Sequence, residues 1–432
     1  MTENALSDTR PGPTIWNSAP MQARIRRRYV KERLFRAAGA AALVVAVGFL
    51  AFLLLTIIAG GWQSFQQTRV LTTVNLGAEK LGITAAELRQ QPQILLRVDF
   101  ESVVAAAMPD RAPANAQVLS DGAWLAVRDA VRDNPGLIGT SQRFWLVASS
   151  DIDQLSKGHF DPRTAVADGS VAPATLAAWQ ELRQQGRLKT SFNREFLTGS
   201  DSIDAELAGV QGALVGSLLT LFVTFIISFP VGVLAAIYLE EFAPRNRWTD
   251  VIEVSINNLA AVPSIIFGLL GLAVFLNVLH MPRSAAIVGG LTLALMTMPV
   301  IVIAGRAAIK SVPPSIRNAA LGVGASPVQV VFHHVLPLAL PGMLTGTILG
   351  LARALGEAAP LLLIGMRAFM TATPRSLTEP ATALPVQIFI WSDNVGRGFV
   401  EKTNGAIIVL LVVLLSVNSL AIYLRNRFEV RW

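Results

Sequence analysis

Residues 318–357 read NAALGVGASPVQVVFHHVLPLALPGMLTGTILGLARALGE and join two kinds of sequence. The stretch begins with small and polar residues and passes two Leu-Pro pairs, Leu336-Pro337 and Leu340-Pro341. It then becomes apolar, with Arg353 and Glu357 embedded in it. The polar part suits contact with a soluble partner, whereas a sustained apolar run suits the interior of a bilayer. The join predicts a membrane helix coupled directly to a partner outside the membrane.

Composition indicates that the chain is a membrane protein. Of its 432 residues, 52% are hydrophobic and 15% are charged, whereas soluble domains carry about 25% charged residues. The chain has no cysteine, which excludes a disulfide framework and thiol chemistry. These figures predict an integral membrane protein.

Apolar runs predict six transmembrane helices and hence an all-α polytopic fold. The first is 37–62, which we interpret as an uncleaved helix because the basic region starts deep in the chain and the apolar run is too long for the core of a signal peptide. The others lie at roughly 210–239, 254–279, 285–303, 340–366 and 406–424. We therefore divide the chain into a basic tail 1–36, helix one at 37–62, a polar segment 63–205, a transmembrane domain 208–424 and a tail 425–432.

The segment 63–205 has no long apolar run and is rich in both signs of charge. Its hydrophobic patterns predict helices near 123–131 and 174–188 and a strand at 144–148. We expect a mixed α/β domain between the first and second membrane helices.

Basic residues set the predicted orientation. Segments 1–36, 240–254, 305–336 and 425–432 hold 16 Lys and Arg in 91 residues, whereas the segments on the other face hold 19 in 184. Because cytoplasmic loops collect Lys and Arg, both termini should be cytoplasmic and 63–205 extracytoplasmic. The basic N-terminal run is then a topology signal, and no nucleic-acid partner is expected.

Motifs for catalysis and metal binding are missing from the sequence. There is no Walker loop, EF-hand loop, zincin motif or supported Ser/His/Asp arrangement. His333 and His334 are adjacent, and neighbours on a helix point about 100° apart, which makes a poor metal pair. We predict no enzymatic activity, no metal site and no cofactor bound by this chain.

The polar half of the opening stretch carries a family pattern. Asn318-Ala319-Ala320, three residues, Gly324 and then Leu336-Pro337 resemble the cytoplasmic loop of ABC importer permeases. That family usually has Glu at the position of Asn318 and Ile at the position of His334. The resemblance implies that the loop 305–336 docks an ATPase.

Three further motifs resemble PstA, the permease family of bacterial phosphate importers. They are 238–248 (YLEEFAPRNRW), 262–271 (VPSIIFGLLG) and 352–360 (ARALGEAAP), where Ala358 replaces the family's usual Thr. The resemblance covers about 210–423, whereas 63–205 departs from shorter members. It implies the type I ABC importer permease fold and a permease that moves phosphate across the bacterial inner membrane by alternating access.

The resemblance also implies partners in that membrane. These are a second permease subunit like PstC, a dimeric ATPase like PstB that uses ATP and Mg²⁺, and a periplasmic phosphate-binding protein like PstS. Three alternatives stay open: a permease for another oxyanion or small solute, an ion channel, and a membrane receptor sensing through 63–205. The receptor is disfavoured because every predicted cytoplasmic piece is shorter than 40 residues.

Residues of the fifth predicted helix suggest packing and a substrate path. Gly342, Gly346 and Gly350 form a small-xxx-small ridge that lets another helix approach closely, unless the spacing is chance. Arg353 and Glu357 share a helix face near the middle of the predicted span. There a charge needs protein or water, and Arg binds phosphate bidentately. A phosphate path and a structural ion pair both fit.

Prolines mark candidate hinges. Pro263-Ser264 and Pro299 interrupt the third and fourth predicted helices, where a pore role and plain kinking are equally consistent. Leu336-Pro337 is the predicted joint between the docking loop and the fifth helix. Residues 367–404 suggest a short interfacial helix with Trp391 at headgroup level.

Overall fold

The computed structural model describes residues 18–107 and 116–428. Contacts divide the chain into two compact units, and the boundary in the sequence falls between Ile57 and Ile58. Among the described residues, the first unit consists almost entirely of the helix α1 (Ala19–Gly61) up to Ile57. The helix begins well before the predicted span 37–62. Its basic first half is helical because Arg and Lys are good helix formers, while residues 1–17 lie outside the described part.

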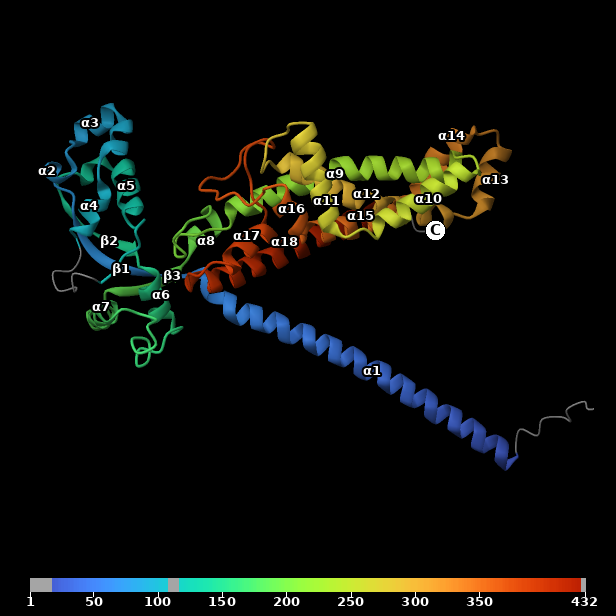
Figure 1. The fold of residues 1–432 in the computed structure, drawn as a ribbon, viewed down its shortest axis with the longest axis horizontal. Coiled ribbons are helices and arrows are strands. Elements are labelled where there is room, and N and C mark those ends of the chain that lie inside the picture. The colour runs from blue at the N-terminus through green and yellow to red at the C-terminus, as the bar shows by residue number, and fades with distance from the viewer. Residues whose placement is uncertain (1–17, 108–115, 429–432) are drawn as a thin grey trace, which may run out of the picture. The chain divides into compact units, whose positions relative to one another are not determined.

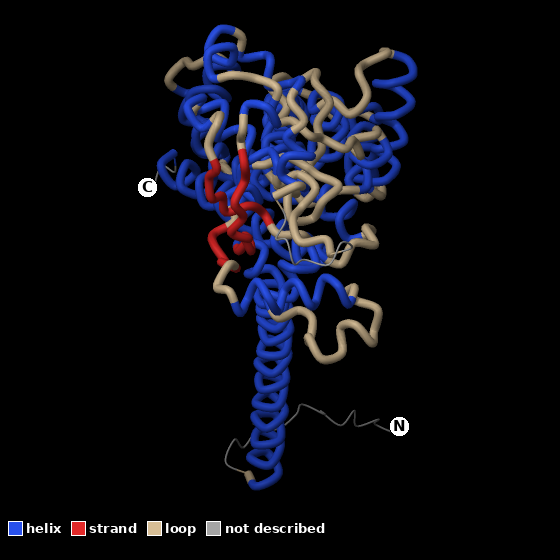
Figure 2. The backbone as a smooth tube through the Cα atoms, turned by 90° about the vertical axis from the view of Figure 1, so that its left-hand side faces the viewer, coloured by secondary structure: helices blue, strands red, loops and turns tan. Residues whose placement is uncertain are grey.

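The second unit contains a small α/β domain that follows α1 and a short turn, η1 (Trp62–Phe65). We call residues 66–192 the insert domain. Its sheet has the order β2-β1-β3, with β1 (Gln66–Asn75) antiparallel to both β2 (Ser141–Val147) and β3 (Leu188–Phe192). Figure 2 shows these strands gathered beside the helices. The helical elements are α2 (Ala78–Leu81), α3 (Ala85–Gln90), η2 (Pro92–Arg97), α4 (Phe100–Ala105), α5 (Trp124–Asp133), η3 (Pro135–Leu137), α6 (Ser150–Lys157) and α7 (Pro173–Gln184).

The insert domain has a hydrophobic core of its own. Alternate residues of β1, such as Val70 and Val74, are buried together with Phe100 and Ile152 from the covering helices. This alternation is the period of two that a half-buried strand requires. After β3, however, α8 (Arg194–Thr198) and residues up to 210 pack with the membrane helices. The predicted segment 63–205 is therefore not a separate compact unit.

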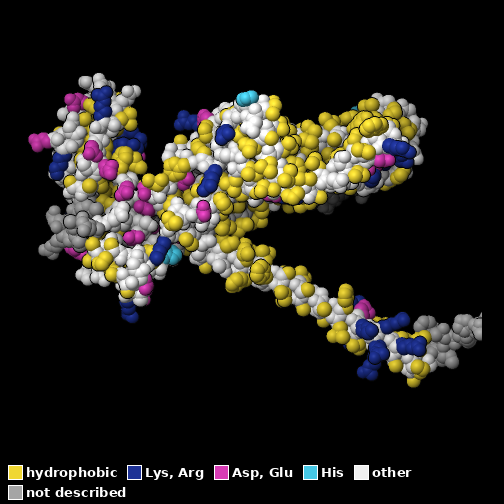
Figure 3. Space-filling view, viewed as in Figure 1, with side chains coloured by type: hydrophobic (Ala, Val, Ile, Leu, Met, Phe, Trp, Pro, Cys, Tyr) yellow, Lys and Arg dark blue, Asp and Glu magenta, His cyan; other side chains and the backbone are white. Residues whose placement is uncertain are grey.

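Long apolar helices make up the rest of the second unit. They are α9 (Gln211–Ile237), α12 (Ala286–Lys310), α15 (Leu336–Leu355) and α18 (Gly398–Phe428). Within residues 18–107 and 116–428, these helices and α1 belong to five segments able to cross a membrane, or up to six if a bent pair counts as one span. Two further buried clusters surround α12, which contacts α9, α10, α11, α15 and α16. In Figure 3, hydrophobic side chains cover the bundle between charge-rich ends.

The bent pair corrects the prediction of one continuous third helix at 254–279. The chain forms α10 (Arg247–Ala260), then α11 (Ser264–Gly271) continued by η5 (Leu272–Val278), and the two parts meet at 102°. The break falls at Pro263, whose ψ of 138° is extended. Proline disfavours the helical conformation of the residue before it, so a helix stops there.

Two other predictions about the spans are wrong. Pro299 does not interrupt the fourth helix, because α12 continues through it, buried among neighbouring helices. Packing in a bundle lets a membrane helix tolerate the lost hydrogen bond. The fifth helix does not run to residue 366, because α15 ends at Leu355 and a short α16 (Ala359–Leu363) follows.

The expected interfacial helix is α17 (Leu384–Ser392), but Trp391 does not lie at an exposed position. Its side chain is 1% exposed, and its indole Nε1 donates to Asp201 Oδ1 at 2.9 Å. A buried indole needs an acceptor, and the carboxylate supplies one. Trp391 thus joins α17 to the segment that leads into α9.

Candidate functional site

The predicted docking loop forms a compact helical segment. After α12, the chain makes α13 (Pro314–Gly322), a tight turn, α14 (Pro327–Gln329) and a π-helical turn, η6 (Val330–Val335). Gly324 has φ of +90° and follows the end of α13, where Gly324 N bonds Leu321 O and Ala325 N bonds Ala320 O. This left-handed cap explains the glycine. We call residues 311–335 the coupling segment.

Small residues of the coupling segment do not all face outward. Asn318 and Ala319 are exposed, but Ala320 is buried against α12 and η6. The surface instead presents large apolar side chains: Leu321, Val323, Val328 and Phe332 are exposed, Val323 to 86%. Exposed apolar groups gathered in one place mark contact sites. The sequence signal for this patch is the four apolar positions themselves, which we passed over in favour of the small residues.

Ion pairs attach the coupling segment to the membrane helices. Arg317 Nη2 lies 2.7 Å from Glu241 Oε1 and also donates to the carbonyl of Ile309 at 2.9 Å. Glu241 belongs to η4 (Tyr238–Phe242), the π-helical end of α9. A guanidinium on the last carbonyls of α12 also opposes the helix dipole. Movement of the coupling segment is therefore coupled to α9 and α12.

A second ionic cluster lies beside the first. Arg306 of α12 contacts Glu240 of η4, with Nε to Oε2 at 3.3 Å, and Glu253 of α10. Lys310 approaches Glu240 at 3.5 Å. The sequence analysis quoted Glu240 and Glu241 as part of a motif but gave them no role. Their partners lie more than 50 residues away along the chain, so no local pattern shows the pairing.

The joint at Leu336-Pro337 is helical. Leu336 begins α15 directly after η6, and Pro337 occupies the first turn. Because the helical path runs without interruption from Pro327 to Leu355, Pro337 removes one backbone donor that the preceding turn would otherwise accept. A π-helical turn disturbs the regular bonding just before it, and such turns often occur at functional sites. The predicted joint thus coincides with a change of helical pitch and not with a break.

The three glycines of the predicted ridge lie against α12. A Cβ placed on Gly346 would stand 2.1 Å from Ala304 Cβ, and one on Gly342 would stand 2.7 Å from Ala308 Cβ. A Cβ on Gly350 would meet Thr297 at 3.8 Å, an ordinary contact. The close approach of α15 to α12 therefore depends on two of the three glycines.

Arg353 and Glu357 sit at the end of α15, and not in the middle of a helix as predicted. Arg353 is in the last turn, and Glu357 follows the cap residue Gly356. Their side chains still meet, with Nε and Oε1 3.4 Å apart, and the Arg353 side chain is 51% exposed. Gly350 lies opposite Thr297, near the middle of α12. The pair is therefore level with the interior of the bundle while facing away from this chain's core.

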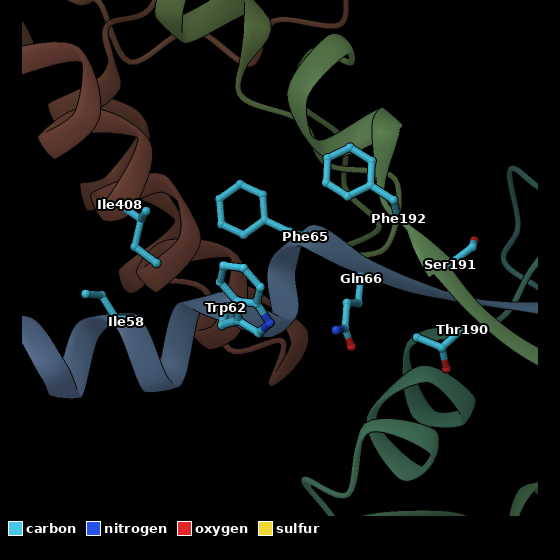
Figure 4. A pocket seen from close by; sticks show the side chains of 8 residues that line it. All are labelled: Ile58, Trp62, Phe65, Gln66, Thr190, Ser191, Phe192 and Ile408. Atoms are coloured by element: carbon cyan, nitrogen blue, oxygen red, sulfur yellow. The ribbon is translucent and has the colours of Figure 1, made fainter. Parts of the chain in front are cut away.

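The remaining predicted residues are distributed over the bundle. Pro263 and Ser264 stand at the break between α10 and α11, and Pro299 is buried in α12. An apolar pocket of about 710 Å³ lies elsewhere, between η1, β3 and α18, where Trp62, Phe65, Phe192 and Ile408 point into it (Figure 4). None of the predicted site residues lines this pocket. Among residues 18–107 and 116–428, no three His, Asp or Glu side chains are placed to hold a metal ion.

Two family models match the chain. Residues 22–165 match a domain of unknown function, DUF3333. Residues 228–432 match the model described as "Binding-protein-dependent transport system inner membrane component". The first match covers most of α1 and the insert domain up to residue 165, and the second covers the helical bundle from within α9 onward.

Curated relatives agree with the second model. The chain is 31% identical to the probable ABC transporter permease protein YqgI of Bacillus subtilis over 63% of its own length and 94% of the relative. It is 32% identical to the phosphate transport system permease protein PstA of Yersinia pestis over 51% of its length and 74% of that protein. It is 30% identical to PstA 1 of Mycobacterium tuberculosis over 50% and 70%.

A solved structure shows a weaker likeness. The inward-facing MetNI methionine ABC transporter aligns with 51% of this chain at 20% identity and a TM-score of 0.39, which adds nothing to the sequence relationship. The family model over residues 228–432 and the residue-level motifs rest on the same part of the chain. The chain therefore belongs to the inner membrane permease components of ABC transporters, in the family that includes PstA.

Proposed function

We propose that this chain is a transmembrane subunit of an ATP-driven importer of inorganic phosphate. The observation that carries the proposal is the 30–32% identity to PstA proteins over half the chain. The region 228–432, which matches the transport-component family model, contains the coupling segment, the glycine ridge and the Arg353–Glu357 pair. One chain thus holds both a surface suited to an ATPase subunit and a charged site in its membrane part.

Phosphate recognition would fall to Arg353. Its guanidinium is half exposed at the level of the bundle interior, and a charge at that depth needs protein or water around it. An Arg fork matches the oxygens of a phosphate. Glu357, 3.4 Å away, would hold the guanidinium when no anion is present and prevent overly tight binding.

The ATPase subunit would dock on the coupling segment. Its exposed apolar patch, Leu321, Val323, Val328 and Phe332, suits the cleft of an ATPase subunit. ATP would be hydrolysed by that dimeric ATPase, like PstB. The ion pairs of Arg317 and Arg306 would pass its movement to α9, α10 and α12. A second permease like PstC would complete the path and cover the face that carries Arg353.

The two ends of the bundle support an orientation in the membrane. The insert domain adjoins the start of α9, whereas Glu241 at its end contacts the coupling segment. A helix of 27 residues spans about 40 Å, and Figure 1 shows α13 and α14 at the end of the bundle away from the insert domain. The basic-residue bias would then place the coupling segment and both termini in the cytoplasm, and the insert domain outside with a phosphate-binding protein like PstS.

Uptake by the complete complex in proteoliposomes tests the proposal. The complex contains this chain, its ATPase, second permease and binding protein. We expect ATP-dependent uptake of radiolabelled phosphate. Arg353→Ala should lower it at least tenfold and Arg353→Lys less, because Lys keeps the charge but loses the bidentate fork.

The matched control is Arg367→Ala. Arg367 is an exposed arginine whose Nη2 lies 4.0 Å from the exposed Asp393 Oδ2, at the outer limit of an ion pair. Normal uptake by both Arg353 variants would show that the pair is structural. Uptake of sulfate or another oxyanion in place of phosphate would favour the second candidate, a permease for that anion.

A further inference from the structure

A buried ionic cluster joins the insert domain to the last membrane helix. Lys157, at the end of α6, places Nζ 2.7 Å from Asp153 Oδ2 and 2.8 Å from Glu401 Oε1. The side chains of Lys157, Asp153 and Glu401 are only 2%, 7% and 3% exposed. Glu401 lies in the first turn of α18, 244 residues beyond Lys157. We call these three residues the junction cluster.

Hydrogen bonds complete the junction cluster from several elements. Glu401 Oε2 accepts a bond from Gln154 Nε2 at 3.0 Å, and His159 Nε2 lies 3.5 Å from the same oxygen. The Glu401 carbonyl accepts from Ser64 Oγ at 2.6 Å. Asp153 Oδ1 accepts from the amide of Thr68 in β1 at 2.8 Å. The Glu401 backbone is therefore held by the turn η1 and its carboxylate by α6, while the Asp153 carboxylate is held by β1.

The backbone of α18 is equally close to the insert domain. A Cβ on Gly398 would lie 2.8 Å from Ser150 Oγ and 2.7 Å from Ala205 Cβ. One on Gly405 would lie 2.5 Å from Ser64 Oγ. The first two turns of α18 thus lie against α6, the turn η1 and the segment after α8, without space for a larger side chain at Gly398 or Gly405.

Breaking such a cluster is costly, because removal of Lys157 leaves two buried carboxylates with a single buried cation, Lys402, beside them. The insert domain and the first turns of α18 must therefore move as one body. Further along, α18 packs on α15, and Arg425 Nη1 lies 3.3 Å from Thr345 Oγ1. The helix α15 carries Arg353. A continuous path of contacts leads from the insert domain to the proposed phosphate site.

We propose that Lys157 is a positioning residue for transport: through Glu401 it fixes α18, and thereby α15, to the insert domain. This inference rests on the proposed phosphate uptake and gives the insert domain a role in it. A cluster that served folding alone would hold the domain in place without affecting how uptake follows ATP hydrolysis.

The test compares Lys157→Met and the milder Glu401→Gln in the full complex. Lys80→Met is the matched control, because Lys80 is an exposed lysine of the same domain. Since the chain has no native cysteine, a covalent replacement can be added: Ser150→Cys with Gly398→Cys, positions within disulfide reach. Ala205→Gly removes the methyl group that the new side chain would meet.

Two quantities are measured, and both are normalised to the amount of assembled complex. Phosphate uptake per ATP hydrolysed should fall at least tenfold in Lys157→Met and stay unchanged in Lys80→Met. Amide hydrogen exchange of residues 398–405, which needs no substrate, should rise at least tenfold. Oxidation of the cysteine pair in the Lys157→Met background should restore uptake, and reductant should abolish the gain.

Three results would overturn the inference. These are a wild-type uptake ratio in both junction variants, faster exchange with an unchanged ratio, and a formed disulfide that fails to restore uptake. Absence of phosphate uptake by the unaltered complex would instead refute the proposed function. In that case the exchange rates, and the ratio of transport to ATP hydrolysis for the true substrate, still decide the role of Lys157.

Discussion

Substitution of Gly346 by alanine should separate α15 from α12, whereas the same change at Gly350 should not. A methyl group on Gly346 would stand 2.1 Å from Ala304 Cβ, but one on Gly350 would stand 3.8 Å from Thr297 Cβ. Overpacking of this kind costs about 1–3 kcal/mol. Alanine also favours a helix over glycine by about 1 kcal/mol, and this gain is common to both variants.

The difference between the two variants therefore isolates the clash. We expect Gly346→Ala to be less stable than Gly350→Ala by about 1–3 kcal/mol, or roughly 5- to 150-fold in the packing equilibrium. Thermal unfolding of the purified complex in detergent measures the order, and uptake measures its consequence. Ala304→Gly added to Gly346→Ala should restore both.

The two variants share a helix, a chemical change and a face, which makes the comparison independent of expression and general helix propensity. Equal melting temperatures for Gly346→Ala and Gly350→Ala, with no effect of Ala304→Gly, would refute the view that α15 and α12 touch through Gly346.

Three other predictions concern the ends of the bundle. Arg317→Glu should lower phosphate transported per ATP several-fold, because Glu241 then faces a like charge, and Arg317→Glu with Glu241→Arg should recover part of it; no recovery would argue against the pair. Val323→Asp should reduce co-purification of the ATPase, since it puts a charge on the exposed apolar patch, and unchanged recovery would contradict a docking role. Burial raises the pKa of Glu206 to about 7, so its stabilising effect is complete below about pH 4.5 and is lost as pH rises through about 7. Melting temperature should therefore fall from pH 5 to pH 8 more steeply in the unaltered protein than in Glu206→Gln. Parallel curves of melting temperature against pH would show that Glu206 is not the source of this pH dependence.

Hydropathy was enough to predict that the chain spans a membrane, but not where each span bends. Residues 361–366 are as apolar as the helix before them, so a sliding average carries the fifth helix through them. The structure turns at Gly356 and again at Gly365, whose φ is +87°. Those turns depend on backbone conformation, to which hydropathy is insensitive.

Long-range pairing explains most of what sequence reasoning missed at the site. Trp391 looked suited to a membrane surface, but its partner Asp201 is 190 residues away. Glu241 likewise meets Arg317 across 76 residues. Arg353 and Glu357 were found because they are four residues apart, and their contact persists although the helix ends between them. Local spacing reveals local pairs, and the remaining ones require the fold.

The junction cluster also bears on how the chain is made. Lys157 leaves the ribosome 244 residues before Glu401, which at about 5–20 residues per second is a wait of roughly 10–50 s. During that interval Lys157 can pair with Asp153 but not yet with Glu401. Only insertion of the final helix completes the buried charges, so a nascent chain cut short before α18 keeps an unfinished surface. Quality-control proteases could distinguish complete from incomplete subunits by that surface.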